Sequence, residues 1–175
     1  MGLLDKAKAA ASKVAETAKD AKGKYDEYAD RKEADAIAKE NEGLTPDEIV
    51  AKDEAKKAIY FQKVEYGTSS SALVKLGTQG LTVHSLNPSK QRIKYLHFTF
   101  SAINRVGDVF ETKTLTQEGP IAPGNKTFVF FKDCFSKLPN KLSLNKVRVE
   151  YFEGDDVVFE GHWMDRLVKK YSITL

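Results

Sequence analysis

Residues 3–38 constrain the fold of this chain most. They form a long alanine-rich segment with charged residues spread through it and no proline. Alanine has the highest helix propensity of all residues, so the segment predicts one continuous helix. A helix whose apolar stripe is mostly alanine buries little area, and apolar area contributes only about 25 cal/mol per Å². We therefore expect this helix to meet another surface: a second copy, another subunit, the rest of the chain or lipid.

The apolar stripe of this helix has two interpretations. An eleven-residue repeat through residues 4, 7, 11, 15, 18 and 29 would keep the helix straighter, but Lys22 and Asp26 interrupt it. Alternating steps of three and four give a heptad pattern, which is typical of a coiled coil and which we favour. This heptad stripe, called the helix seam below, consists of Leu4, Ala7, Ala11, Val14, Ala18, Ala21, Tyr25 and Tyr28.

The charges of the first forty residues balance, with nine Lys or Arg against nine Asp or Glu. Neutrality argues against nucleic-acid binding by the helix, which needs a surplus of basic residues. It also removes the polybasic signal for anionic membranes. The start, Gly2-Leu3-Leu4 followed by lysine and alanine with Thr17 on the polar side, resembles the surface-lipid helices of the synuclein type. That resemblance implies a membrane surface as the alternative partner.

Cys134 is the only cysteine, so no internal disulfide can form, which favours a reducing compartment. The first thirty residues lack the continuous apolar stretch of a signal peptide. No segment approaches the roughly 20 apolar residues of a membrane span. Lys6 stands where myristoylation needs Ser or Thr. We expect a cytoplasmic protein, with association with a membrane or a larger assembly left open.

A second, shorter helix is predicted after Asn41-Glu42-Gly43, in which glycine ends the first helix. Thr45 is the expected N-cap, with Pro46 in the first turn and Glu48 completing a capping box. The helix should run to about Lys57, with its inward positions at Ile49, Val50 and Ala58. The run GLTPDEI at 43–49 resembles the second half of a SHOCT-type bacterial oligomerisation hairpin. We assign 1–57 to a helical oligomerisation or anchoring segment and 58–175 to a β domain.

From Ile59 onward the apolar residues recur with a period of two, which indicates strands. The strand from Arg92 places Leu96 and Phe98 on one face, with Ile93 and His97 on the other. Short strands at this spacing predict an antiparallel sandwich, and the fold class is therefore α+β. The expected strands are 58–66, 72–76, 79–85, 92–102, 108–115, 126–131, 143–152 and 156–161.

Four motifs in this half resemble a bacterial β-sandwich module: IKYLHFTF at 93–100, NRVGD at 104–108, GPIAPG at 119–124 and VRVEYFEG at 147–154. The resemblance implies an immunoglobulin-like fold found in bacterial or phage proteins, and it carries no catalytic residue across. Gly107, Gly119 and Gly124 fit turns that need a positive φ.

The sequence offers no catalytic, cofactor or metal site. His84, His97 and His162 lack metal-ligand spacing. Cys134 stands between aromatic residues without a paired histidine, so we interpret it as a half-buried structural thiol. Glu153-Gly154-Asp155-Asp156 is a hairpin connection and not a calcium loop. We expect neither an enzyme nor a small-molecule substrate.

The C-terminal tail is ambiguous. A spacing of i, i+3, i+4, i+7 suits an amphipathic helix, whereas 171–175 also reads as a terminal strand. In either form its apolar residues should cap the sandwich or dock on a neighbour. These tail residues are Met164, Leu167, Val168 and Tyr171.

Taken together, these features predict a structural or scaffolding protein of bacterial or phage origin that assembles through its N-terminal helix, as a homo-oligomer or with a protein partner, and displays a β-sandwich. The alternatives are a peripheral membrane protein, whose helix binds lipid, and an adaptor or inhibitor, whose sandwich binds a partner by strand addition. Nucleic acid is not an expected partner.

Overall fold

The computed structural model describes the backbone of residues 3–68 and 78–174, and side chains within those ranges except at residues 3–18 and 20. The chain divides into two compact units, Met1–Gly43 and Leu44–Leu175. The division lies after Gly43, so residues 44–57, which the sequence assigned to the helical segment, belong to the unit that contains the sheets.

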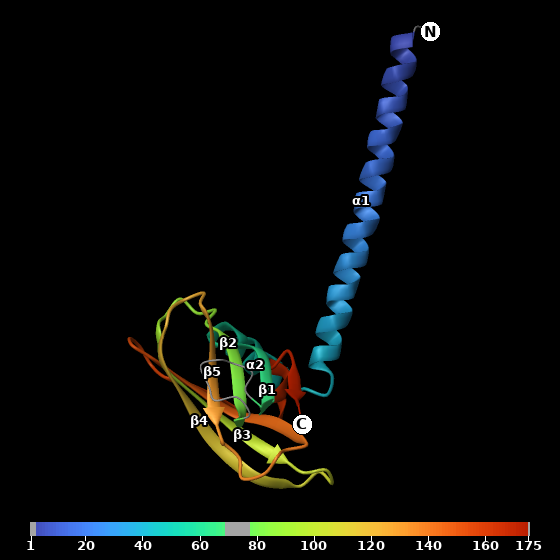
Figure 1. Ribbon diagram of the computed structural model, residues 1–175. Helices are drawn as coiled ribbons and strands as arrows, with labels where there is room; N and C mark the ends of the chain where they lie inside the picture. The colour runs from blue at the N-terminus through green and yellow to red at the C-terminus, as the bar shows by residue number, and fades with distance from the viewer. Residues whose placement is uncertain (1–2, 69–77, 175) are drawn as a thin grey trace. The chain divides into compact units, whose positions relative to one another are not determined.

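The first unit is the single helix α1 (Leu3–Asn41, Figure 1). Gly43 follows it with φ +75°, the left-handed conformation in which glycine commonly ends a helix. Among the described residues, no helix is long and apolar enough to cross a membrane.

The second unit begins with α2 (Pro46–Ala58), whose capping box is confirmed. The Thr45 backbone N–H donates to Glu48 Oε2 over 2.9 Å, and the Glu48 N–H donates back to Thr45 Oγ1. The buried face of α2 consists of Lys52, Ala55 and Ala58. The inward position predicted for Val50 is wrong: its side chain is 62% exposed. Val50 lies two residues before Lys52, which turns it to nearly the opposite side of the helix.

Two four-stranded sheets follow, which confirms an α+β fold rich in antiparallel pairing (Figure 1). One has the order β5-β2-β1-β8 and the other β4-β3-β6-β7. Every strand pair is antiparallel except β1 with β8. The predicted strand 72–76 lies outside the described residues. The strands are β1 (Tyr60–Thr68), β2 (Gln79–Leu86), β3 (Ile93–Ile103), β4 (Val109–Ile121), β5 (Lys126–Lys132), β6 (Lys141–Tyr151), β7 (Val157–Glu160) and β8 (Tyr171–Ile173).

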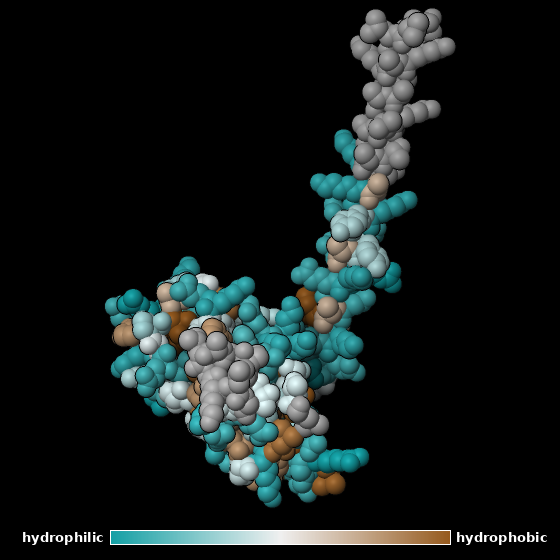
Figure 2. Space-filling model, in the orientation of Figure 1, coloured by the Kyte–Doolittle hydropathy of each residue, from teal (hydrophilic) through white to brown (hydrophobic). Residues whose placement is uncertain are grey.

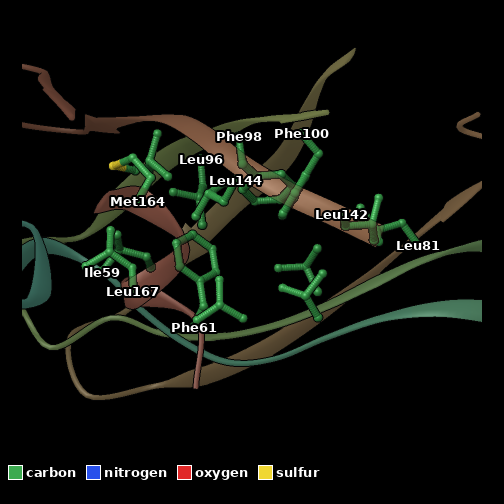
Figure 3. Packing of buried hydrophobic residues seen from close by; sticks show 14 of the residues in the cluster. Ile59, Phe61, Leu81, Leu96, Phe98, Phe100, Leu142, Leu144, Met164 and Leu167 are labelled. Atoms are coloured by element: carbon green, nitrogen blue, oxygen red, sulfur yellow. The ribbon is translucent and has the colours of Figure 1, made fainter. Parts of the chain in front are cut away.

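The inner faces of both sheets share one core, into which the side chains shown in Figure 3 converge. Phe98 on β3 is central to it. Its ring packs edge-on against Phe61 of β1, at 6.1 Å between centroids, and against Phe131 of β5, at 5.5 Å. Aromatic pairs in this geometry add stabilisation beyond the area they bury.

The strand β3 departs from simple alternation near its start. Leu96 and Phe98 are buried as predicted, but Ile93, expected on the opposite face, is fully buried too. The pairing of β3 with both neighbours shifts register between Ile93 and Tyr95. Such an irregularity adds a residue to one strand and thereby turns the side chains before it to the other face.

The glycine assignments are confirmed at two of three positions. Gly107 and Gly124 have φ +98° and +74°, whereas Gly119 does not have a positive φ. Gly119 is required for a different reason: a Cβ atom there would lie 2.5 Å from the Ile93 carbonyl oxygen. The close approach of β3 to β4 excludes a side chain at this position.

Candidate functional site

The helix seam is the first candidate. α1 is helical from Leu3, but the side chains of Leu4, Ala7, Ala11, Val14 and Ala18 lie outside the described residues. At the described end of the seam, Ala21 is exposed, Tyr25 is 72% exposed and Tyr28 is 58% exposed. Every side chain from Ala21 to Lys39 is exposed, and Figure 2 shows mostly hydrophilic colouring over this part of α1. Tyr25 and Tyr28 are the largest exposed aromatic side chains in this part of α1.

Charged residues surround these rings in a definite order. Lys32 Nζ lies over the Tyr28 ring, 5.1 Å from its centroid, in a cation–π arrangement. By heptad position, Lys24 and Arg31 flank the seam on one side, with Ala29 and Ala36 on the other. Beside Tyr25 and Tyr28, one border of the seam thus carries Lys24 and Arg31, and the other carries Ala29 and Ala36, with Lys22 one turn earlier on that same side.

The tail is not an exposed docking element. It forms a 3-10 helix, η1 (His162–Leu167), followed by β8. Met164 and Leu167 are fully buried and Val168 is 8% exposed, so these predicted interaction residues belong to the core of their own domain. Tyr171 is half-buried and starts the strand that runs parallel to β1. The tail therefore combines both predicted forms, one after the other.

Asp165 holds this tail in place. Its Oδ1 accepts hydrogen bonds from the Leu144 backbone N–H and the Tyr171 hydroxyl, both over 2.7 Å. Its Oδ2 accepts one from the Ser143 hydroxyl over 2.8 Å. Burial, together with the neighbouring carboxylate, raises the pKa of Tyr171. Asp165 also lines a cavity of about 470 Å³, but three donors already occupy its oxygens, so its role there is structural.

His97 stands in a row of hydrogen-bonding groups on the outer face of β3, β4 and β6. Its Nδ1 lies 2.8 Å from Thr116 Oγ1 and its Nε2 3.0 Å from Glu150 Oε1. Arg148 bridges Glu150 and Asp156. Thr116, His97 and Glu150 stand in an order that a proton relay also uses. Both ring nitrogens of His97, however, already contact side-chain oxygens on the sheet face. The row therefore explains how the face is held together, and the sequence revealed only that His97 points outward.

The other two histidines each lie against a carboxylate. His84 Nε2 is 3.2 Å from Glu65 Oε2, and His162 Nδ1 is 3.2 Å from Glu48 Oε1. The described residues contain no group of three or more His, Cys, Asp or Glu side chains that could hold a metal ion.

Cys134 and Glu111 have shifted pKa values with structural causes. Burial raises the pKa of the Cys134 thiol to about 11, which makes it a poor nucleophile. Hydrogen bonds from the Ser136 backbone N–H and hydroxyl, both 2.7 Å, together with Lys113, hold the pKa of Glu111 at about 2. Glu111 thereby fastens the chain after β5 to β4.

An exposed aromatic patch on β5 is the surface that sequence reasoning missed. Phe128 is 62% exposed, and its ring stacks on His84 at 6.0 Å between centroids. The alternation KTFVFFK was visible at 126–132, but periodicity alone does not say which of its faces points away from the core.

Comparison with protein-family models, with curated proteins and with solved structures gives no significant match to this chain.

Proposed function

We propose that this protein is a non-enzymatic structural or scaffolding protein, which assembles through α1 and displays the two-sheet domain. The observation that supports this best is the exposure of Tyr25 and Tyr28 at one end of a seam that consists mostly of alanine. Two large rings on a helix with no buried described side chain between Ala21 and Lys39 suit a surface that is covered by a partner.

The energetics of α1 favour a partner. Helices in proteins gain most of their stability from packing an apolar face, and propensity contributes less. Each tyrosine can bury on the order of 150–250 Å². Pairing two seams would therefore cover several times the area that the alanines offer alone. The small alanine side chains would let the two backbones approach closely.

A second copy of the chain, parallel to the first, is the partner that the charges favour. In a parallel pair, Lys24 and Arg31 of one helix approach Ala29 and Ala36 of the other, so neither of these basic residues faces a like charge, although Lys32, one heptad after Tyr25, meets its own copy. An antiparallel pair brings the borders that carry Lys24 and Arg31 together, and like charges would then repel. A parallel homo-oligomer is thus the arrangement we propose.

The resemblance to immunoglobulin-like modules of bacterial and phage proteins supports a display role for the two-sheet domain. Its buried thiol and its engaged histidines suit a structural task. We propose a cytoplasmic location, as part of a larger assembly.

The test is sedimentation equilibrium of the full chain and of the double variant Tyr25→Ala, Tyr28→Ala. We expect the wild-type chain to form a concentration-dependent oligomer and the variant to dissociate. Glu27→Ala with Asp30→Ala, on the far side of the same helix, is the matched control and should assemble like the wild type. A wild-type chain that stays monomeric, with helicity that rises only when phosphatidylcholine–phosphatidylglycerol vesicles are added, would assign α1 to a lipid surface instead.

A further inference from the structure

The outer face of β5 presents a row of four side chains with a regular chemical order. Residues alternate sides along a strand, so Lys126, Phe128, Phe130 and Lys132 share one face. They lie opposite Leu86, His84, Thr82 and Gly80 of β2. Phe131, between them, packs into the core against Phe98, which shows that the row is on the outside. Along this face, one lysine is thus followed by two phenylalanines and then by a second lysine.

The two rings are supported from beneath. His84 stacks on Phe128 with 29° between the ring planes, and His84 is itself oriented by Glu65. Phe130 covers Gly80, where an added Cβ would lie 2.5 Å from the ring. A surface whose side chains are already held in place loses less conformational entropy when it binds.

β5 also has an open edge. It is the end strand of its sheet, and among the described residues only β2 pairs with it. One side of its backbone therefore presents N–H and C=O groups to any strand that approaches. The edge strands β7 and β8 have only four and three residues. The edge strand β4 is longer, but Thr112, Thr114 and Thr116 make its outer face polar.

Self-pairing along this edge is unfavourable in the register that pairs the whole strand. Two copies of β5 that pair antiparallel about Val129 place Lys126 of each copy opposite Lys132 of the other. Like charges directly opposite each other destabilise a strand pair. The lysines thus discriminate against a second copy, and they favour a strand with acidic residues at the same two positions.

We propose that the open edge of β5 binds an extended segment of a different protein by strand addition. The segment carries two acidic residues that flank two apolar residues, all at alternate positions. Its backbone pairs with the edge, its apolar side chains cover Phe128 and Phe130, and its carboxylates approach Lys126 and Lys132. Lys132 Nζ already lies 3.7 Å from Asp133, so the stronger attraction is at Lys126. The site lies in the unit Leu44–Leu175 and does not depend on α1.

The test uses the full chain and three fluorescently labelled peptides in an anisotropy titration at low salt. The peptide ETVTVTE carries the proposed pattern, KTVTVTK reverses its charges, and ETVTVTE with N-methylvaline at its third position removes a backbone donor that faces the edge in an antiparallel pair. We expect ETVTVTE to bind at least about tenfold more tightly than either of the others, a difference of about 1.4 kcal/mol. The double variant Lys126→Glu, Lys132→Glu should reverse the preference and bind KTVTVTK.

Phe128→Ala should weaken ETVTVTE binding about tenfold. Phe152→Ala, an exposed ring (51%) beyond the end of β6, is the matched control and should have no effect. The proposal is overturned if ETVTVTE does not bind, or if the charge reversal leaves the preference unchanged. It is also overturned if replacing Leu73, Val74 and Leu76 by serine raises peptide affinity about tenfold, because the chain's own segment would then occupy the edge.

Discussion

Single polar residues, placed at the joints between elements, hold much of the two-sheet domain together. Asp165 joins η1, β6 and β8 through three accepted hydrogen bonds. Glu111 joins β4 to the turn after β5 in the same manner. Each carboxylate satisfies backbone and side-chain donors that belong to different parts of the chain, and removing it would leave several donors without an acceptor at once.

Asp165→Ala should destabilise the domain more than the loss of any one of its donors. Leaving the Leu144 N–H, the Ser143 hydroxyl and the Tyr171 hydroxyl unsatisfied should cost about 2–4 kcal/mol in total, whereas a single net hydrogen bond contributes about 1 kcal/mol. Urea unfolding monitored by Trp163 fluorescence measures the difference. Ser143→Ala is the control and should cost about 1 kcal/mol. Equal losses in the two variants would contradict the joint role of Asp165.

Glu111 makes the domain sensitive to acid in a defined range. Its pKa is held at about 2 in the folded protein, below the ordinary value of 4.5. A lowered pKa means that its contribution to stability is complete above pH 4.5 and is lost as the pH falls toward 2. Urea unfolding of the wild-type chain across this range, compared with Glu111→Gln, should show a steeper loss of stability in the wild type. Parallel pH profiles would contradict the prediction.

Elements whose boundaries depend on local chemistry could be predicted from the sequence. Thr45, Pro46 and Glu48 mark the start of α2 because a capping box involves only neighbouring residues. The inward side of Ile93 could not be predicted, because its register depends on pairing with both β4 and β6. The tail remained ambiguous for the same reason: β8 exists through its parallel pairing with β1, more than a hundred residues earlier.

The candidate binding surfaces also differ in whether they depend on local sequence or on long-range pairing. The helix seam was visible in the sequence because a heptad is a local pattern. The outer row on β5 was not, since its exposure depends on which face of the sheet packs on Phe98. The network around His97 joins three strands, and no spacing along the chain indicates it.

Gly119 tests the close contact between β3 and β4. Gly119→Ala places a methyl group 2.5 Å from the Ile93 carbonyl oxygen, so the two strands must move apart. We expect a loss of about 1–3 kcal/mol in urea unfolding, as for other overpacked sites. Gly67→Ala, where the nearest atom is 3.2 Å away near the chain terminus, is the control and should cost less. A Gly119→Ala variant with the same free energy of unfolding as the wild type would contradict the close contact between β3 and β4.

At the scale of the whole molecule, the two units differ in how they are stabilised. Leu44–Leu175 has an apolar core shared by both sheets, whereas the described side chains of α1 from Ala21 to Lys39 are all exposed. We propose that a partner stabilises α1, since binding to the folded form raises stability. This contrast leads us to place assembly in α1 and a separate recognition edge on β5.

Assembly through the seam is the central claim, and sedimentation equilibrium of the full chain tests it most directly. We expect the average mass to rise with concentration in the wild type and in the Glu27→Ala, Asp30→Ala control, and to stay at that of one chain in the Tyr25→Ala, Tyr28→Ala variant. A wild-type chain that remains a monomer at the highest concentration, or a tyrosine variant that assembles equally well, would contradict it.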